Sequence, residues 1–333
     1  MDLVDRRLLN LLQSSFPLVA EPFQALGGQL GISEEEVMLR TATLKRKNVI
    51  RQISAIFDTR RLGYKTSLVA ARYPTTALTR AAHDINRHPG VSHNYARNGY
   101  FNLWFTLAVP PDQSLEATVE RLAQETGAEA VRILPTVRFF KIGVNFDMVE
   151  EKGAAYDYYS PDGYGDGQAP WSNGETLTPL EIHVVRELQE DLPLRPQPFQ
   201  AIAERLDVSQ EELFACARSF QERGIMRRYS AVLHHRRAGF RANGMGVWRV
   251  PPERSEEVGR IMAGHPAVSH CYERPTFSDW PYSHFTMIHA TSKDGCEQIA
   301  REISDQTGIN DYRVLYSYRE YKKTRVRYFV EGA

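Results

Sequence analysis

The chain of 333 residues is poor in cysteine, with only Cys216, Cys271 and Cys296, and none of these forms a Cys-x-x-Cys pair. Three widely spaced cysteines support neither a disulfide framework nor a thiolate zinc site. No apolar run reaches the roughly 18 residues of a membrane-spanning helix. The first seven residues mix acids and arginines instead of forming the apolar core of a signal peptide. We therefore expect a cytoplasmic protein with no membrane association.

The chain also lacks an excess of charge of either sign, because Lys+Arg and Asp+Glu both number 41. This balance argues against a protein whose affinity depends on neutralising many phosphates, although a local basic patch stays open. A Gly-rich phosphate loop, a His-Glu-x-x-His motif and a nucleophile elbow are absent as well. Aromatic residues are plentiful, with 16 Tyr and 15 Phe, enough to line a flat ligand as well as to fill cores.

The most informative feature of the sequence is an internal repeat. Residues 22–25 recur at 198–201, and residues 88–97 recur at 265–274. The offset of 176 and then 177 residues is far too long for a solenoid repeat. We therefore predict the same fold twice, as copy one and copy two, joined by the Gly- and Pro-rich linker 151–176.

The first part of each copy, residues 1–60 and 177–237, is predicted to form three short helices and an extended segment. Ser33 with Glu36, and Ser209 with Glu212, have the spacing of a capping box at the start of the third helix. Gly224 is expected to end this helix in copy two, where copy one has Asn48. This order is typical of a winged helix-turn-helix.

The second part of each copy, residues 61–150 and 238–333, is predicted to alternate strand, helix, strand, strand, helix, strand. This order gives a ferredoxin-like antiparallel sheet with helices on one face, and hence an α+β fold. The other face of each sheet needs a partner, so we expect the two sheets to pack face to face as an internal pseudo-dimer. The expected segments are 64–72, 76–87, 91–98, 101–109, 114–126 and 130–146, and then 240–250, 255–264, 267–274, 282–290, 295–307 and 311–328.

A winged helix followed by a ferredoxin-like domain is the layout of the Lrp/AsnC transcription regulators. In such proteins the first turn of the recognition helix contacts bases. Here that turn carries Glu34, Glu35 and Glu36 in copy one, and Glu211 and Glu212 in copy two. Carboxylates at this position repel the DNA phosphates, so no specific DNA binding is expected. A regulator that senses a small ligand stays open as an alternative.

Histidine is distributed unevenly, with three in copy one and seven in copy two. Residues 234–237 read His-His-Arg-Arg where the equivalent residues 58–61 of copy one read Asp-Thr-Arg-Arg. Together with Arg227 and Arg228, these residues flank a short apolar strand. They form either an exposed strand with charged ends or an anion site, since arginine binds carboxylates through two parallel hydrogen bonds.

Two further groups of residues can bind an anion. His93, Tyr95 and Arg97 alternate along one predicted strand and therefore share one face, as their equivalents His270, Tyr272 and Arg274 do in copy two. A single strand histidine is more often structural than a ligand, but the recurring trio makes the two interpretations equal. The C-terminal segment 316–328 carries five cations and four tyrosines, which suit either an edge strand protected by charge or a flat polyanionic ligand.

At these residues the chain resembles the siroheme decarboxylases of the Lrp/AsnC-like superfamily. More narrowly, it is similar to a fusion of their two related subunits, the NirD–NirL or AhbA–AhbB type. The resemblance covers nearly the whole chain. It is carried by Ala55-Ile56-Phe57-Asp58, Val91-Ser92-His93-Asn94-Tyr95 and Arg138-Phe139-Phe140-Lys141 in copy one, and by Arg227-Arg228-Tyr229, Gly239-Phe240 and Tyr321-Lys322-Lys323 in copy two.

The resemblance implies removal of two acetate carboxylates from siroheme as CO2, giving didecarboxysiroheme in haem d1 or alternative haem biosynthesis. It also implies no cofactor beyond the iron of the substrate. Siroheme is a flat iron macrocycle with carboxylate side chains, so arginines, aromatic walls and an axial histidine are suited to bind it. The alternatives are the ligand-sensing regulator and a protein that binds a tetrapyrrole without catalysis.

On this basis we predict the site residues. The catalytic group comprises His235, His270, Arg228, Tyr229 and Tyr272. Either His235 or His270 is the candidate axial ligand of the substrate iron, and the sequence does not order them. The predicted substrate-binding residues are Arg227, Arg236, Arg274, Lys322, Trp248, Arg51, His93, Tyr95 and Arg97. The copy-one residues of this set form either a second, equivalent binding site or a remnant of the duplication. A homodimer beyond the internal pseudo-dimer stays open.

Overall fold

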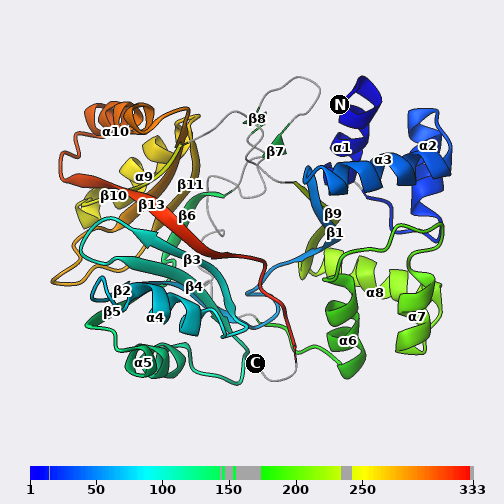
Figure 1. The fold of residues 1–333 in the computed structure, drawn as a ribbon, viewed down its shortest axis with the longest axis horizontal. Coiled ribbons are helices and arrows are strands. Elements are labelled where there is room, and N and C mark those ends of the chain that lie inside the picture. Colours follow the sequence, from blue (N-terminus) through cyan, green and yellow to red (C-terminus); the bar gives the residue numbers. More distant parts are fainter. Residues whose placement is uncertain (15, 143–144, 147–152, 155–173, 234–241, 331–333) are drawn as a thin grey trace.

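A computed structural model describes the chain, apart from residues 15, 143–144, 147–152, 155–173, 234–241 and 331–333. It has a helical part and a larger part built on β-strands (Figure 1). Most of the predicted linker 151–176, together with His235 and Arg236, lies outside the described residues.

The helical part contains one three-helix unit from each copy, as predicted. Ser33 and Ser209 each begin a third helix, and each Oγ accepts a hydrogen bond of 3.2 Å from the backbone N–H three residues on. Of these two predicted capping boxes, the one at Ser209 is complete, whereas at Ser33 the Glu36 carboxylate accepts from Arg40 instead. The elements are α1 (Leu3–Ser14), α2 (Pro22–Leu30), α3 (Glu34–Arg46) and β1 (Ile50–Phe57), and then α6 (Pro179–Leu188), α7 (Gln200–Leu206), α8 (Gln210–Glu222) and β9 (Met226–Leu233).

Strands β1 and β9 pair with each other and join the two units. Ser54 lies opposite Ser230, its equivalent in the repeat, so the pairing is symmetric about this point. Phe23 of copy one and Phe199 and Phe220 of copy two are fully buried in one common core. The two units therefore fold together around β1 and β9 and do not form separate domains.

The β-rich part has the predicted element order in each copy. In copy one it comprises β2 (Lys65–Arg72), α4 (Leu78–Ile85), β3 (Val91–Arg97), β4 (Leu103–Val109), α5 (Leu115–Thr126), β5 (Ala130–Leu134) and β6 (Arg138–Ile142). In copy two it comprises β10 (Ala242–Trp248), η2 (Pro252–Arg254), α9 (Ser255–Gly264), β11 (Val268–Glu273), β12 (His284–Ala290), α10 (Lys293–Thr307) and β13 (Tyr312–Lys323). Two short strands, β7 (Asn145–Phe146) and β8 (Gly153–Ala154), pair separately.

The last strand of each copy was expected to complete its own sheet, and here the structure differs. In copy one, β5 pairs with β2, but β6 crosses over to pair with β11 of copy two. In copy two, the first half of β13 pairs with β10 and the second half with β3 of copy one. This exchange links nine strands in the order β5-β2-β4-β3-β13-β10-β12-β11-β6. It also satisfies backbone groups on β3 and β11 that would otherwise be free sheet edges.

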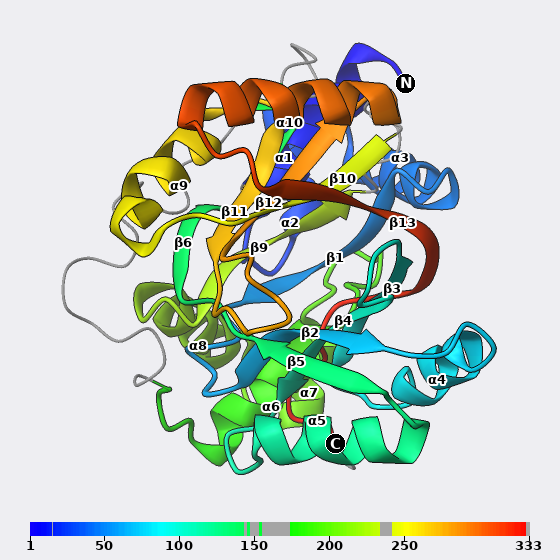
Figure 2. The same ribbon diagram turned by 90° about the vertical axis from the view of Figure 1, so that its left-hand side faces the viewer.

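The two halves of this sheet pack face to face through aromatic side chains, as predicted. Trp104 of copy one contacts Trp280 and Phe285 of copy two, with ring centroids 5.2 Å and 6.5 Å apart. Helices α4 and α5 cover the outer face of one half, and α9 and α10 cover that of the other (Figure 2).

After β13 the chain returns to the helical part. Tyr328 is buried against Tyr64, and its hydroxyl lies 2.7 Å from Thr59 Oγ1. The backbone N–H of Phe329 donates to the Tyr64 hydroxyl at 2.6 Å. These contacts connect the β-rich part to the end of β1, where candidate site residues lie.

The described residues contain neither a membrane-spanning helix nor a cluster of metal-binding side chains. None of the helices there is both long and apolar enough to cross a membrane. The same residues hold no group of three or more His, Cys, Asp or Glu side chains placed to bind a metal ion.

Candidate functional site

Most of the predicted site residues that the structure describes fall into two groups related by the internal repeat. The first group, here called the Arg325 cluster, comprises Arg51, His93, Tyr95, Arg97, Arg228, Lys323 and Arg325. The second, here called the Asp58 cavity, is lined by Asp58, Thr59, Arg60, Thr66, Ser67, Leu68, Thr106, Thr136, Phe139, Arg227, Tyr272 and Arg274.

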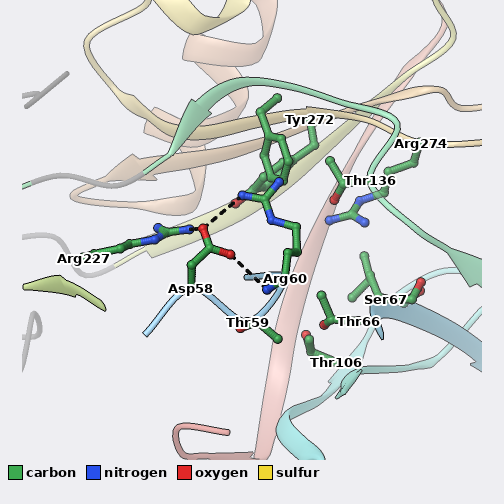
Figure 3. Close-up of a pocket in the computed structure, with 12 residues that line it drawn as sticks. Asp58, Thr59, Arg60, Thr66, Ser67, Thr106, Thr136, Arg227, Tyr272 and Arg274 are labelled. Carbon is green, nitrogen blue, oxygen red and sulfur yellow. Dashed lines mark hydrogen bonds and ion pairs between the residues drawn. The ribbon is translucent and has the colours of Figure 1, made fainter. Parts of the chain in front are cut away.

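One end of the Asp58 cavity is an ion-pair network (Figure 3). Arg227 Nη2 donates to Asp58 Oδ2 at 2.8 Å, and Arg60 Nη2 lies 3.4 Å from the same oxygen. Burial alone raises the pKa of the Asp58 carboxyl, but the charges of Arg227 and Arg60 outweigh it and lower this pKa to about 2. Asp58 is therefore ionised and acts as a counterion that the cavity carries itself.

Arg274 lies at the other end of the Asp58 cavity (Figure 3). Its Nη1 donates to the Leu134 carbonyl, and its guanidinium carbon lies 5.1 Å from the centroid of the Tyr272 ring. Its Nε is shielded from solvent and has no hydrogen-bond partner among the described residues. Burial lowers the pKa of the Arg274 guanidinium to about 10, and it raises the pKa of the Tyr272 hydroxyl to about 12. Both groups are protonated at neutral pH.

Arg97 repeats this arrangement in copy one. It is 7% exposed, its Nη1 donates to the Leu315 carbonyl at 3.3 Å, and it lies over the Tyr95 ring at 5.4 Å. Its Nε is also buried without a partner in the described part of the chain. Arg97 and Arg274 are thus equivalent cations, and in each the buried Nε–H is among the N–H groups left to donate.

The cations of the Arg325 cluster lie around the start of β1. Arg51 Nη2 donates to the Lys323 carbonyl at 2.9 Å, and Arg325 Nη1 donates to Ser54 Oγ at 3.2 Å. Burial and the nearby charge of Arg51 lower the pKa of Arg325 to about 10. Within the described residues, no carboxylate forms an ion pair with Arg51, Lys323 or Arg325. These three cations therefore have no carboxylate counterion in the part of the chain that the structure describes.

His93 lies within this cluster. Burial, with the charges of Lys323 and Arg51, lowers the pKa of His93 to about 4, so its imidazole is neutral at pH 7. Its Nδ1 lies 3.0 Å from Ser92 Oγ, and its ring centroid lies 6.2 Å from that of Tyr95. A neutral imidazole can accept a proton or bind a metal ion.

The equivalent His270 has a different environment. Its Nδ1 lies 2.8 Å from Ser269 Oγ, which is also 2.6 Å from His289 Nε2. The His270 and Tyr272 rings lie 5.9 Å apart, so the predicted shared face of this trio is present in both copies.

Three predicted site residues lie elsewhere. Tyr229 is 2% exposed in the helical core, where its ring contacts Phe199. Trp248 is fully buried beneath α9 and α10, and its Nε1 donates to Thr286 Oγ1 at 2.9 Å. Lys322 Nζ donates to the Asn86 carbonyl at 2.9 Å and so caps the end of α4. Alternation shows which residues share a face, but it does not show which face meets the core.

Several residues of these groups were not predicted as site residues. Lys323 lies in the Arg325 cluster in place of Lys322, and Arg325 counted only as one cation of the C-terminal segment. Asp58 counted only as the equivalent of His234 and as part of the motif at residues 55–58. The repeat could have indicated this position, because copy one has an acid there and copy two has a histidine.

Models of two protein families match the chain, each of them twice. The AsnC-like ligand binding domain matches residues 61–141 and 237–322. The siroheme decarboxylase NirDL-like HTH domain matches residues 5–51 and 181–227. Together these matches cover both parts of both copies.

Full-length relatives agree with the family models. The chain is 40% identical to the siroheme decarboxylase of Hydrogenobacter thermophilus over 98% of this chain and 95% of that protein. It is similar to the crystal structure of the siroheme decarboxylase NirDL, with a TM-score of 0.78 and 36% identity over 98% of this chain and 95% of that one. A second structure of NirDL, in co-complex with an iron-uroporphyrin III analogue, matches with the same TM-score, identity and coverage. The chain therefore belongs to the siroheme decarboxylase family, in its fused, duplicated form.

Proposed function

We propose that this chain is a siroheme decarboxylase, which removes two acetate carboxylates of siroheme as CO2 and yields didecarboxysiroheme. The observation that carries the proposal is the positive charge of Arg51, Lys323 and Arg325. These three cations lie together without a described carboxylate partner, and the partly buried Arg325 is costly to desolvate unless an anion pairs with it. A polycarboxylate substrate supplies several such anions at once.

The two groups differ in charge and volume, and these differences indicate which one binds the tetrapyrrole. The Asp58 cavity holds its own counterion and has a volume of about 270 Å³, which is small even for an ordinary ligand pocket. In the repeat, Asp58 and Thr59 correspond to His234 and His235. Copy two therefore has histidines in the sequence where copy one has the acid of the cavity, and the lack of a carboxylate at these positions favours a polyanion. We assign the substrate to the Arg325 cluster.

We propose His235 rather than His270 as the axial ligand of the substrate iron. His235 lies outside the described residues, but it follows Leu233, which pairs with Ile50 next to Arg51. His270 is bound to Ser269 on β11, close to the Asp58 cavity. The neutral His93 is a second imidazole within the Arg325 cluster.

For this reaction the protein needs only to position the substrate, remove water from the reacting carboxylate and supply a proton. When a carboxylate leaves as CO2, the carbon–carbon bond breaks and its electron pair passes into the macrocycle, and the remaining carbon then takes a proton to become a methyl group. In the proposed site, Arg51 and Arg325 hold carboxylates. Arg97 stacks on Tyr95, and Tyr95, which lies beside His93, is the proton source.

The test is anaerobic incubation of the purified chain with siroheme, followed by mass spectrometry of the product. We expect a loss of mass equal to two CO2 molecules. His235→Ala and His93→Ala should lose turnover, and loss of the axial ligand should also shift the Soret band of the bound substrate. His270→Ala is the matched control and should keep its activity. A product of unchanged mass contradicts the enzyme, and inactivity of the control alone contradicts the assignment of the site.

We further propose that the helical part does not bind specific DNA. Arg40 on α3 is already paired with Asp2 and Asp5 at 2.8 Å each, and Lys45 is paired with Asp191 at 2.7 Å. These two cations of α3 are engaged and its first turn is acidic, which disfavours contact with phosphates. A salt-dependent gel shift with the upstream DNA of its own gene would instead support the regulator.

A further inference from the structure

We propose that the Asp58 cavity is a second ligand site, separate from the tetrapyrrole site, which binds the carboxylate group of one short organic acid at Arg274. The proposal goes beyond the decarboxylation of siroheme and does not depend on it.

Arg274 provides the first argument. Its Nε is shielded from solvent and has no described hydrogen-bond partner, and no described carboxylate forms an ion pair with it. Its single hydrogen bond goes to the neutral carbonyl of Leu134. A desolvated guanidinium with no anion is unfavourable, and a bound carboxylate would satisfy both its charge and its remaining N–H groups.

Hydroxyl groups in the Asp58 cavity provide the second argument. Thr66, Thr106 and Thr136 line it, and their hydroxyls form no hydrogen bond with other described side chains or backbone groups. Figure 3 shows Thr136 beside the Arg274 guanidinium, with Thr66 and Thr106 below it. These hydroxyls are free to donate to an anion held by Arg274.

The hydroxyl lining is specific to this cavity and is not a feature of both copies. The equivalent of Thr66 in the repeat is Ala242, which has no hydroxyl. The equivalent of Thr106 is Thr286, whose Oγ1 accepts from Trp248 Nε1 at 2.9 Å inside the copy-two core.

The size and charge of the cavity limit the class of ligand. A volume of about 270 Å³ takes a short acid and a few water molecules. Leu68 and Phe139 offer apolar contact to an alkyl chain. Asp58 pairs with Arg227 and Arg60 at the opposite end from Arg274 (Figure 3), so Arg274 is the lining arginine that has no described carboxylate and can hold a single one. These features favour a monocarboxylate over a dianion such as phosphate.

Isothermal titration of the full chain with sodium propionate, without siroheme and in low chloride, tests the proposal. We expect one propionate at Arg274, besides any that the cations of the Arg325 cluster take up. Arg274→Gln should weaken the affinity of the Arg274 site at least tenfold, because it removes a charge-assisted pair. The matched control is Arg97→Gln, the equivalent arginine of copy one, which should leave the binding of propionate at Arg274 unchanged.

Thr106→Val provides an independent variant that keeps all charges, and we expect a severalfold loss of affinity. If Arg274→Gln does not fold, this variant decides the outcome. No propionate binding by the wild-type chain, or equal binding by the Arg274→Gln and Arg97→Gln chains, overturns the proposal. Tighter binding of phosphate contradicts the class of ligand. Displacement of propionate by siroheme shows that the carboxylate belongs to the substrate and overturns the separate site, whereas turnover of siroheme is measured independently.

Discussion

Replacement of Asp58 by asparagine is the sharpest test of the charge balance around β1. The substitution keeps the shape of the side chain but removes the anion between Arg227 and Arg60. Asp58 is 6% exposed, and its pKa falls from 3.8 to about 2 on folding. A shift of this size corresponds to about 2 kcal/mol of stability at neutral pH. Because two partly buried arginines lose their counterion, we expect Asp58→Asn to lose about 2 to 3 kcal/mol.

The pH dependence of the effect follows from the direction of the shift. A lowered carboxyl pKa contributes its full stability above the unfolded value near 4, and this contribution is lost as the pH falls toward 2. Urea unfolding followed by circular dichroism at pH 7 and at pH 3 measures it. The difference between the wild-type and Asp58→Asn chains should be large at pH 7 and smaller at pH 3.

A matched control separates this effect from general charge loss. Asp305 on α10 is exposed and forms no ion pair with any described residue. Asp305→Asn should therefore change the free energy of unfolding by less than about 0.5 kcal/mol at either pH. Equal stability of the Asp58→Asn and wild-type chains at pH 7, or a difference that stays constant with pH, would refute the reasoning.

Three other outcomes are expected. Arg325→Gln should raise the KM for siroheme about tenfold or more, and Arg325→Lys should raise it less, because only lysine keeps the charge; equal values in steady-state assays would remove Arg325 from the site. In NMR, the His93 ring should show no titration between pH 8 and pH 5, since burial and nearby cations lower its pKa to about 4; a midpoint near 6.5 would contradict this. Gly259→Ala should destabilise the chain by about 1 to 3 kcal/mol in thermal unfolding, because the new methyl group would lie 2.3 Å from the Phe140 ring. Gly264→Ala meets no atom within 4 Å and should be neutral or slightly stabilising; equal melting temperatures for the two alanine variants would contradict the packing of β6 on α9.

Local features of the sequence were enough to predict the elements and their order. Ser33 and Ser209 begin their helices because a hydroxyl beside three free N–H groups accepts one of them. Asn48 and Gly224 end the same helices in the left-handed region, with φ of 53° and 69°. These signals act over a few residues, so they can be found without any knowledge of tertiary structure.

Strand partners could not be predicted in the same way. Alternation predicts that β13 is a strand, but it does not show that its first half pairs with β10 and its second half with β3. The placement of Lys322 at α4, and of Lys323 in the Arg325 cluster, depends on that pairing.

The sequence by itself therefore determined the duplication, the α+β elements and the trios of His, Tyr and Arg, because each is a property of short segments or of their repetition. Only the tertiary structure decided that Asp58 neutralises Arg227, 169 residues away, while Arg325 stays without a described carboxylate. The charge of a site is the sum over side chains that folding brings together, and in this protein those side chains come from both copies.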